Sequence, residues 1–317
     1  MWFKNLRLYR LTKSFDLSAE QLNGQLESQA FHDCPRLQPF SFGWVSPLGR
    51  QGQQLVHAAN GRLLVCARRE EKILPAGVIR GMVQDKVAQL EEERLRKVSR
   101  REKNMIRDEL LQELMPRALC RSTHTFAYIA PQEGWIVIDV SNRSRAEELL
   151  ALLRKSIGSL AVVPLAVNQA PAAVMTRWLI ERRLPEGLDL GAECTLRDSD
   201  DVAGVVRCRN QDLLSHEIGT HIEAGKQVIR LSLAWKGGLS FVLDEDMSIK
   251  RLRFADVIEE KLADVSEDDE AARFDNDFAI MTLELARFIP HLLEQFGGVN
   301  EDQDAGKVTV TGDLVAA

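Results

Sequence analysis

The sequence has little cysteine and no long hydrophobic run, and both absences narrow what it can be. Its five cysteines are scattered, with no C-x-x-C pair, so neither a disulfide framework nor a zinc knuckle is indicated and we expect reduced, mostly buried thiols. The start mixes Lys4, Arg7 and Arg10 into its apolar residues, unlike a secretory signal. No later stretch approaches the roughly 18 apolar residues of a membrane span. We therefore expect a cytosolic protein.

Motifs of catalysis and metal binding are also missing. The segment HEIGTH resembles the zinc-protease motif H-E-x-x-H, but His216 and His221 are five residues apart, about 140° around a helix, and cannot share one metal ion. The loop LGRQGQQ lacks the Lys-Ser/Thr of a phosphate cradle, and no G-x-S-x-G elbow supplies a nucleophile. We predict no enzyme activity, no catalytic residues, no metal and no cofactor.

Acids outnumber bases overall, but positive charge is concentrated in one stretch. The formal net charge is -6, yet Arg94 to Arg107 carries seven bases and one acid, Glu102. By contrast, Asp256 to Asp277 carries ten acids and two bases. This asymmetry is typical of a polyanion-binding surface paired with a solvated acidic region, although one solvated helix face and one solvated loop explain it equally well.

The hydrophobic pattern predicts a mixed α+β fold. Strands are expected at residues 2–11, 60–70, 123–131, 134–141, 160–167, 188–198, 204–212, 228–235, 239–246 and 249–256. Helices are expected at residues 18–30, 144–158, 173–183, 215–225 and 274–298. Ser18 with Gln21 and Ser144 with Glu147 have the spacing of capping boxes, and Pro290 is expected to kink or break the last helix.

A helical hairpin is predicted between the second and third of these strands. From Pro75 the period changes to 3.6, and one apolar stripe follows: Val78, Ile79, Met82, Val83, Val87 and Leu90. A capping box of Ser99 and Glu102 starts a second helix, from about Arg100 to Met115, ended by Pro116. The hairpin would interrupt an α+β domain and carry the basic residues around its bend.

Local stability does not explain these bases. Arg100 and Arg101 open the second helix, where the helix dipole disfavours exposed cations by about 0.3 to 1 kcal/mol each. Arg100, Lys103 and Arg107 share one face, which suits a stripe that follows phosphates. Two more bases extend the run past the hairpin: Arg117 and Arg121. No stacking aromatics, recognition helix or zinc finger accompany them, so we expect binding to a nucleic-acid backbone with little sequence readout.

Seven stretches, in order along nearly the whole chain, carry a family resemblance. They are WFKNLRLYRL, ANGRLLVCARREEKILP, MPRA, LALLRKSIGSLAVVPL, NQDLLSHEIGTHIEAGK, LSLAWKGGLSFVLDEDMSIKRLRF and FDNDFAIMTLELA. They resemble the RdgC family of bacterial recombination-associated DNA-binding proteins. The resemblance implies a ring-shaped homodimer, joined at both ends, whose positively lined hole encloses duplex DNA. It also implies restraint of RecA-promoted strand exchange, and a nucleoid-associated place in the cytoplasm.

The resemblance also implies which residues touch DNA. Asn210 and Gln211 match a family polar/basic pair before Asp212, and Leu119 stands where the family segment L-P-R-A-F has an aromatic, which makes it a candidate interface residue. The full set of expected DNA contacts is Arg94, Arg96, Lys97, Arg100, Arg101, Lys103, Arg107, Arg117, Arg121, Asn210 and Gln211.

The expected domains are a central α+β domain (1–75 with 117–166), the hairpin (76–116), a second α+β domain (167–298) and a tail (299–317). Two other functions stay open. One is a protein-interaction module whose basic hairpin docks an acidic partner. The other is a Mg²⁺-dependent nuclease that uses the acids between Asp264 and Asp277, although such a run is more typical of a solvated segment.

Overall fold

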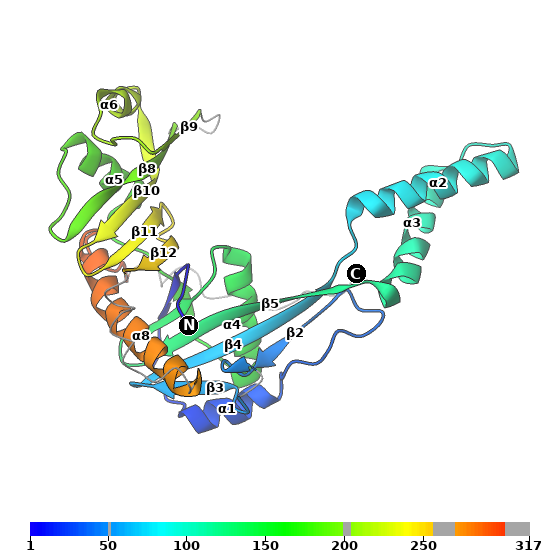
Figure 1. The fold of residues 1–317 in the computed structure, drawn as a ribbon, viewed down its shortest axis with the longest axis horizontal. Helices are drawn as coiled ribbons and strands as arrows, with labels where there is room; N and C mark the ends of the chain where they lie inside the picture. The colour runs from blue at the N-terminus through cyan, green and yellow to red at the C-terminus, as the bar shows by residue number, and fades with distance from the viewer. Residues whose placement is uncertain (50–51, 199–203, 256–269, 302–317) are drawn as a thin grey trace.

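The chain forms an open crescent (Figure 1). The computed structural model describes residues 1–49, 52–198, 204–255 and 270–301. A seven-stranded sheet lies in the middle, a five-stranded sheet at one end and a helical hairpin at the other (Figure 1). The predicted α+β class is confirmed.

The central sheet is antiparallel throughout, in the order β2-β4-β5-β6-β1-β7, with β3 also paired to β4. Its strands are β1 (Arg7–Leu11), β2 (Phe40–Val45), β3 (Val56–Ala59), β4 (Arg62–Lys72), β5 (Cys120–Ala130), β6 (Trp135–Ile138) and β7 (Val162–Pro164). β4 and β5 stay paired from Leu63 opposite Ile129 to Lys72 opposite Cys120. With β2, which pairs with β4 as far as Glu71, they extend past the other strands as an arm that carries the hairpin (Figure 1).

Each face of this sheet buries its own core, because side chains alternate along every strand. On β4, Leu63 and Val65 pack with α1 (Ala19–Glu27) and α4 (Arg143–Ile157), whereas Leu64 packs with α8 (Glu270–Glu294) and the second sheet. The Ser18–Gln21 capping box is present at the start of α1. The predicted Ser144 box is wrong, since the side chain of Asn142 caps α4 instead.

The five-stranded sheet has the order β12-β11-β10-β8-β9, which leaves β9 at one edge. Its strands are β8 (Leu188–Asp198), β9 (Val205–Arg209), β10 (Lys226–Trp235), β11 (Leu239–Asp244) and β12 (Ile249–Phe254). α5 (Pro171–Ile180) and α6 (His216–Glu223) pack against it on the side away from the hairpin (Figure 1). α8 continues through Pro290, so the helix has no break there, and the kink that was the other expectation stays a prediction.

Main-chain hydrogen bonds join the two sheets. Leu6 donates to the carbonyl of Ile249 at 2.8 Å and accepts from its amide at 3.0 Å, and the amide of Leu252 donates to Lys4 at 2.8 Å. Both sheets and α8 share one continuous apolar core. The curved body of the molecule is therefore one packed unit.

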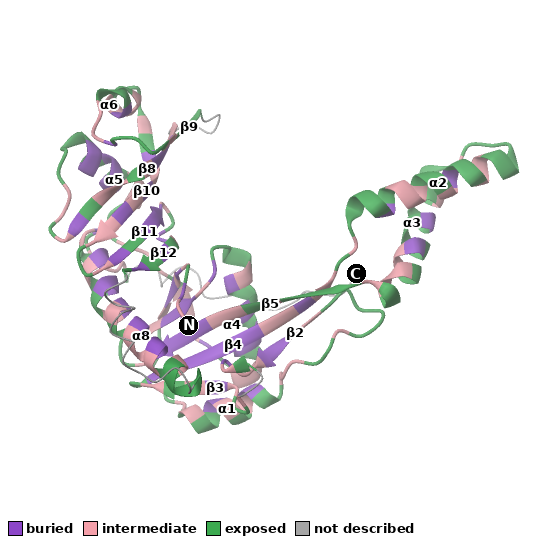
Figure 2. Cartoon of the chain, viewed as in Figure 1, coloured by how far each residue is buried: buried purple, intermediate pink, exposed green. Residues whose placement is uncertain are grey.

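The hairpin consists of α2 (Ala76–Arg94) and α3 (Arg100–Leu114), followed by a 3₁₀ turn at Met115–Arg117. Its small core contains buried Val87, Ile106 and Leu110. Val78, predicted within the apolar stripe, is 56% exposed, whereas Ile79 beside it is buried. Exposed residues cover most of the hairpin (Figure 2).

The cysteines depart from expectation in one respect. All five are free, but only Cys66 and Cys194 are buried, whereas Cys120 is exposed. Burial raises the pKa of the Cys66 thiol to about 12. The prediction of mostly buried thiols is wrong, because Cys120 begins β5 at the exposed end of the arm.

Candidate nucleic-acid interface

Two acidic side chains fix the backbone of the hairpin bend. The carboxylate of Glu91 accepts from the amide of Val98 at 2.9 Å. Glu102 accepts from the amide of Ser99 at 2.9 Å, while the Ser99 hydroxyl oxygen accepts from the Glu102 amide at 3.3 Å, which is the predicted capping box. The chain can therefore reverse within Leu95 to Ser99 without burying any of the bases.

Arg96 is the one base of the bend with a close acidic partner in the described structure. Its guanidinium donates to both oxygens of Glu102, Nη2 to Oε1 at 2.6 Å and Nη1 to Oε2 at 3.1 Å. That bidentate contact, with the hydrogen bonds from Ser99, lowers the pKa of Glu102 to about 2. Arg94 lies at the limit of ion pairing, with its Nη1 4.0 Å from Glu102.

The other bases of the bend are exposed and form no ion pair with any described residue. They are Lys97, Arg100, Arg101, Lys103 and Arg107. The bend from residue 94 to 107 carries seven bases and one acid, whereas the rest of the hairpin (76–93 and 108–116) carries two bases and seven acids. The two helices thus place a local charge of about +6 at their free end, beyond stems of charge about -5.

The two bases after the hairpin differ from each other. Arg117 lies exposed on the 3₁₀ turn. Arg121 instead pairs with Glu71 on the neighbouring strand, and its hydrogen bond lowers the pKa of that carboxyl. Arg121 therefore belongs to the charge network of the arm, while Arg117 is free to meet a ligand.

The structure places Asn210 and Gln211 far from the hairpin, at the end of edge strand β9 (Figure 1). Both are exposed, and Asn210 has a left-handed backbone with φ of 52°. The amide of Leu214 donates to Asp212 Oδ1 at 2.9 Å, which shapes the turn into α6. These residues and the bend thus occupy the two ends of the crescent.

Two arginines beside Asn210 were missed by the sequence interpretation. Arg207 and Arg209 alternate with half-buried residues along β9 and point outward, and neither forms an ion pair with a described residue. The signal was present in VVRCR, where bases recur with the period of two that puts them on one strand face.

Leu119 is 78% exposed where the hairpin meets the arm. Its carbonyl accepts from the amide of Ile73 at 2.8 Å, and Ile73 is itself exposed. Phe40, opposite Glu71 in the sheet, adds a third exposed apolar side chain at this end of the arm. An apolar group of this kind on a polar arm is typical of a protein contact.

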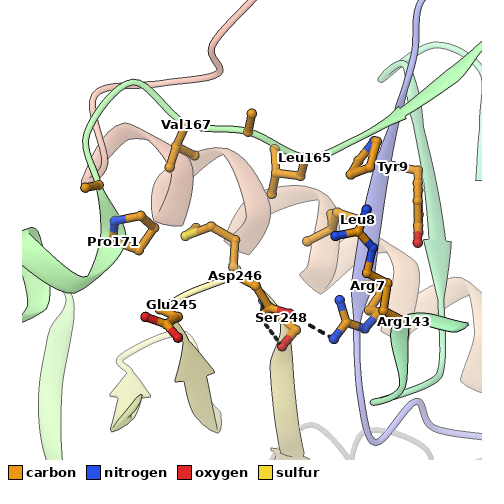
Figure 3. Close-up of a pocket in the computed structure, with 14 residues that line it drawn as sticks. Arg7, Leu8, Tyr9, Arg143, Leu165, Val167, Pro171, Glu245, Asp246 and Ser248 are labelled. Atoms are coloured by element: carbon orange, nitrogen blue, oxygen red, sulfur yellow. Dashed lines mark hydrogen bonds and ion pairs between the residues drawn. The ribbon is translucent and has the colours of Figure 1, made fainter. Parts of the chain in front are cut away.

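A cavity of about 330 Å³ opens between the two sheets (Figure 3). Its charged groups all have partners: Arg7 donates to Asp246 at 2.9 Å within the lining, whereas Arg143 donates to Glu147 at 2.8 Å and Glu245 accepts from Arg197 at 2.9 Å, both partners lying outside the lining. Among the described residues no group of three or more histidine, cysteine or acidic side chains has the arrangement of a metal site. No helix within the described part is long and apolar enough to cross a membrane.

The fold and the site define an α+β protein whose unpaired cations gather on an inserted helical hairpin. A family model described as "Putative exonuclease, RdgC" matches residues 1–299. The chain therefore belongs to the RdgC family.

Three relatives illustrate the likeness, each named "Recombination-associated protein RdgC". The protein of Aeromonas hydrophila is 47% identical over 298 residues, which cover 94% of this chain and 98% of the relative. The protein of Tolumonas auensis is 44% identical, with 94% and 99% covered. That of Yersinia pestis is also 44% identical, with 94% and 98% covered. The family is one of recombination-associated proteins.

Proposed function

We propose that this chain binds duplex DNA through its phosphates, without sequence preference, as a dimeric ring that restrains RecA-promoted recombination. The observation that carries the proposal is the set of exposed, unpaired bases at the hairpin bend. Arg100 and Arg101 begin α3, where the helix dipole disfavours cations by about 0.3 to 1 kcal/mol each, so a ligand and not the helix accounts for them. Such bases suit phosphate groups as ligands. The name of the relatives associates those proteins with recombination.

The spacing of the bases supports backbone binding. Arg100, Lys103 and Arg107 lie on one side of α3 and span about 10 Å along its axis, which is enough to reach more than one phosphate. Asn210 and Gln211, with Arg207 and Arg209, would supply contacts at the other end of the crescent. We keep the eleven predicted DNA contacts as proposals, with Arg121 the least available because Glu71 holds it.

The ring is the second part of the proposal. Two crescents related by a two-fold axis would close into a ring if each joined the other at both ends. The exposed group of Leu119, Ile73 and Phe40 is our candidate for one of these contacts. A closed ring would occupy the duplex and deny it to RecA, with no direct contact to RecA required.

The test combines salt and topology. The logarithm of the binding constant should fall by about 0.9 for each phosphate neutralised per tenfold rise in salt. Protein loaded on closed circular duplex should resist a high-salt wash better than protein on the same duplex cut once, because a ring slides off an end but must open to leave a circle. Leu119→Asp should remove that difference and lower the dimer fraction in sedimentation. Equal loss of wild-type protein from both DNA forms would contradict the ring, and a flat salt response would contradict phosphate binding.

A nuclease is the second candidate, because the description of the matching family names an exonuclease. The acidic run that we considered for Mg²⁺ lies largely outside the described residues. Of its described members, Asp275 is 3.1 Å from Nε2 of His57 and Asp277 pairs with the N-terminus of Met1, so both have structural partners. We expect DNA to remain intact with Mg²⁺ or Mn²⁺, and cleavage that is lost in Asp268→Asn/Asp269→Asn would establish the nuclease instead.

The third candidate, an interaction module, predicts tight binding of an acidic protein without DNA affinity. The exposed bases of the bend fit an acidic protein as well as DNA, but this candidate does not predict the salt dependence that is expected for binding to a duplex.

A further inference from the structure

The apex of the hairpin bend is a leucine. Leu95 follows α2 directly and is 93% exposed, more than any other large hydrophobic side chain in the described residues. Its backbone is left-handed, with φ of 52° and ψ of 31°. It follows the C-terminal end of α2, which is the end of that helix furthest from the sheets (Figure 1).

Neither the backbone nor the core accounts for a leucine here. A left-handed residue that ends a helix is usually glycine, since a β-carbon crowds the following carbonyl oxygen, and asparagine is the next best choice. The side chain of Leu95 also gains nothing from folding, because it stays in water. An unfavourable backbone conformation that holds up an exposed apolar group points to a ligand.

The residues around Leu95 indicate the class of ligand that it would meet. Arg94, Arg96 and Lys97 flank it in the chain, and Arg100 and Arg101 begin the next helix across the bend. Of these five only Arg96 has a close acidic partner among the described residues. An apolar side chain flanked by cations complements a duplex, in which apolar base faces lie between two rows of phosphates.

We propose that Leu95 inserts between adjacent base pairs of the duplex whose phosphates the surrounding bases hold. This inference rests on the proposed DNA binding, and it adds that the side chain of Leu95 acts as a wedge between base pairs. Insertion needs no fixed sequence, since every base step offers apolar faces, although flexible pyrimidine–purine steps should accept the wedge most easily.

The test uses full-length protein and duplexes that carry 2-aminopurine, a base whose fluorescence rises when it unstacks. Wild-type protein should raise the fluorescence at saturation. Leu95→Gly and Leu95→Asn, which both suit a left-handed backbone, should abolish the rise. Their affinity should fall by about tenfold at most, because the unstacking that they avoid offsets part of the lost burial. Their salt slope should stay within about 0.9 of the wild-type value, since no base is removed.

Met105→Ala is the matched control. Met105 is 54% exposed on the same hairpin but lies within α3, more than one helical turn past the apex at Leu95. Its replacement should leave the fluorescence signal unchanged. Melting should occur at an equal or higher temperature in Leu95→Gly than in wild type, so that loss of signal cannot be ascribed to unfolding.

The outcomes separate the wedge from the binding that it extends. Salt-dependent binding by the wild type without a fluorescence rise overturns the wedge alone. Absence of any DNA binding overturns both proposals. If Leu95→Gly keeps the fluorescence rise but loses sedimentation with vesicles of anionic phospholipid, or loses dimer formation, then Leu95 meets a membrane or a second copy and the wedge is wrong.

Discussion

The hairpin bend and the five-stranded sheet both carry many bases, but on the sheet, outside Arg207 and Arg209 of edge strand β9, most of them are ion-paired. On the sheet, Arg230 donates to Asp244 at 2.6 and 2.9 Å, Arg197 pairs with Glu245 at 2.9 Å, and Arg251 pairs with Glu193 at 2.9 Å. At the bend, five exposed bases form no ion pair with any described residue. A base with a partner holds the fold together, whereas a base without one is available to a ligand.

The secondary structure explains the difference. Strand register puts Arg230 directly opposite Asp244, so a cross-strand partner is fixed by the sheet itself. The hairpin keeps its acids apart from the bases: those of α2 precede the bend, and Glu91 is engaged with the amide of Val98. The sequence shows the excess of bases at the bend, but only the strand register shows which bases of the sheet are paired.

The double variant Arg100→Glu/Arg101→Glu should change DNA binding more than any other variant considered below. Two charges reverse where a duplex is expected, so we predict a fall in DNA affinity of about 100-fold or more at low salt, with a slope lower by about 2. Melting temperature should stay equal or rise, since acids suit the first turn of a helix. Anisotropy titrations and thermal melts measure both effects.

A folded double mutant with unchanged DNA affinity would remove the hairpin from the interface. Arg100→Lys with Arg101→Lys keeps both charges and should bind nearly as well as wild type.

Arg230→Met should produce the opposite pattern. It leaves the nearly buried Asp244 with Lys250 as its remaining basic partner, so the free energy of unfolding should fall by about 1 to 2 kcal/mol while DNA affinity stays within twofold (about 0.4 kcal/mol). Urea denaturation measures the free energy of unfolding, and fluorescence anisotropy measures the DNA affinity. A large loss of affinity without destabilisation would mean that this face of the sheet also contacts DNA.

Glu102→Gln should have the smallest effect of the three, and it tests whether the paired base Arg96 can join the unpaired ones. Glutamine preserves the capping box but releases Arg96, so DNA affinity should rise severalfold and the salt slope should increase by about 0.9. An unchanged slope would indicate that Arg96 does not reach a phosphate even when it is unpaired.

The same variant predicts a pH effect. The pKa of Glu102 is lowered to about 2 in the folded protein, so its stabilising contribution is complete above its ordinary pKa near 4.5 and is lost as the pH falls towards 2. The difference in melting temperature between wild type and Glu102→Gln should therefore shrink between about pH 4.5 and 2. A constant difference across that range would show that the charge of Glu102 does not stabilise the bend.

The sequence predicts best those features that depend on near neighbours. The capping boxes at Ser18 and Ser99 were correct because their partners lie three residues away. The box at Ser144 failed because Asn142 competes for the same helix start. β2 was not predicted at all: Gly43 weakens its strand pattern, and the structure explains the glycine, since a β-carbon there would lie 2.6 Å from the Cα of Phe31.

In the candidate site, too, contacts between residues far apart in the sequence could not be predicted. The clustering of bases at the bend was visible in the sequence, but the pairing of Arg121 with Glu71 was not, since 49 residues separate them and only the register of β4 and β5 brings them together. The roles of Asn210 and Gln211, and the division into domains, stay predictions.

The hydrogen bonds between Leu6 and Ile249 bear on the mechanics of the molecule. Because main-chain groups form them, these bonds do not depend on which side chains lie at the joint, but Leu6 and Ile249 are also fully buried in the shared core, so packing and hydrogen bonds together fix the angle between the two sheets. Bending at the joint requires breaking several of these bonds together with the shared core. A pull on the arm is therefore resisted by these bonds and by the shared core together, and the load passes through the body to the second sheet and its edge strand β9.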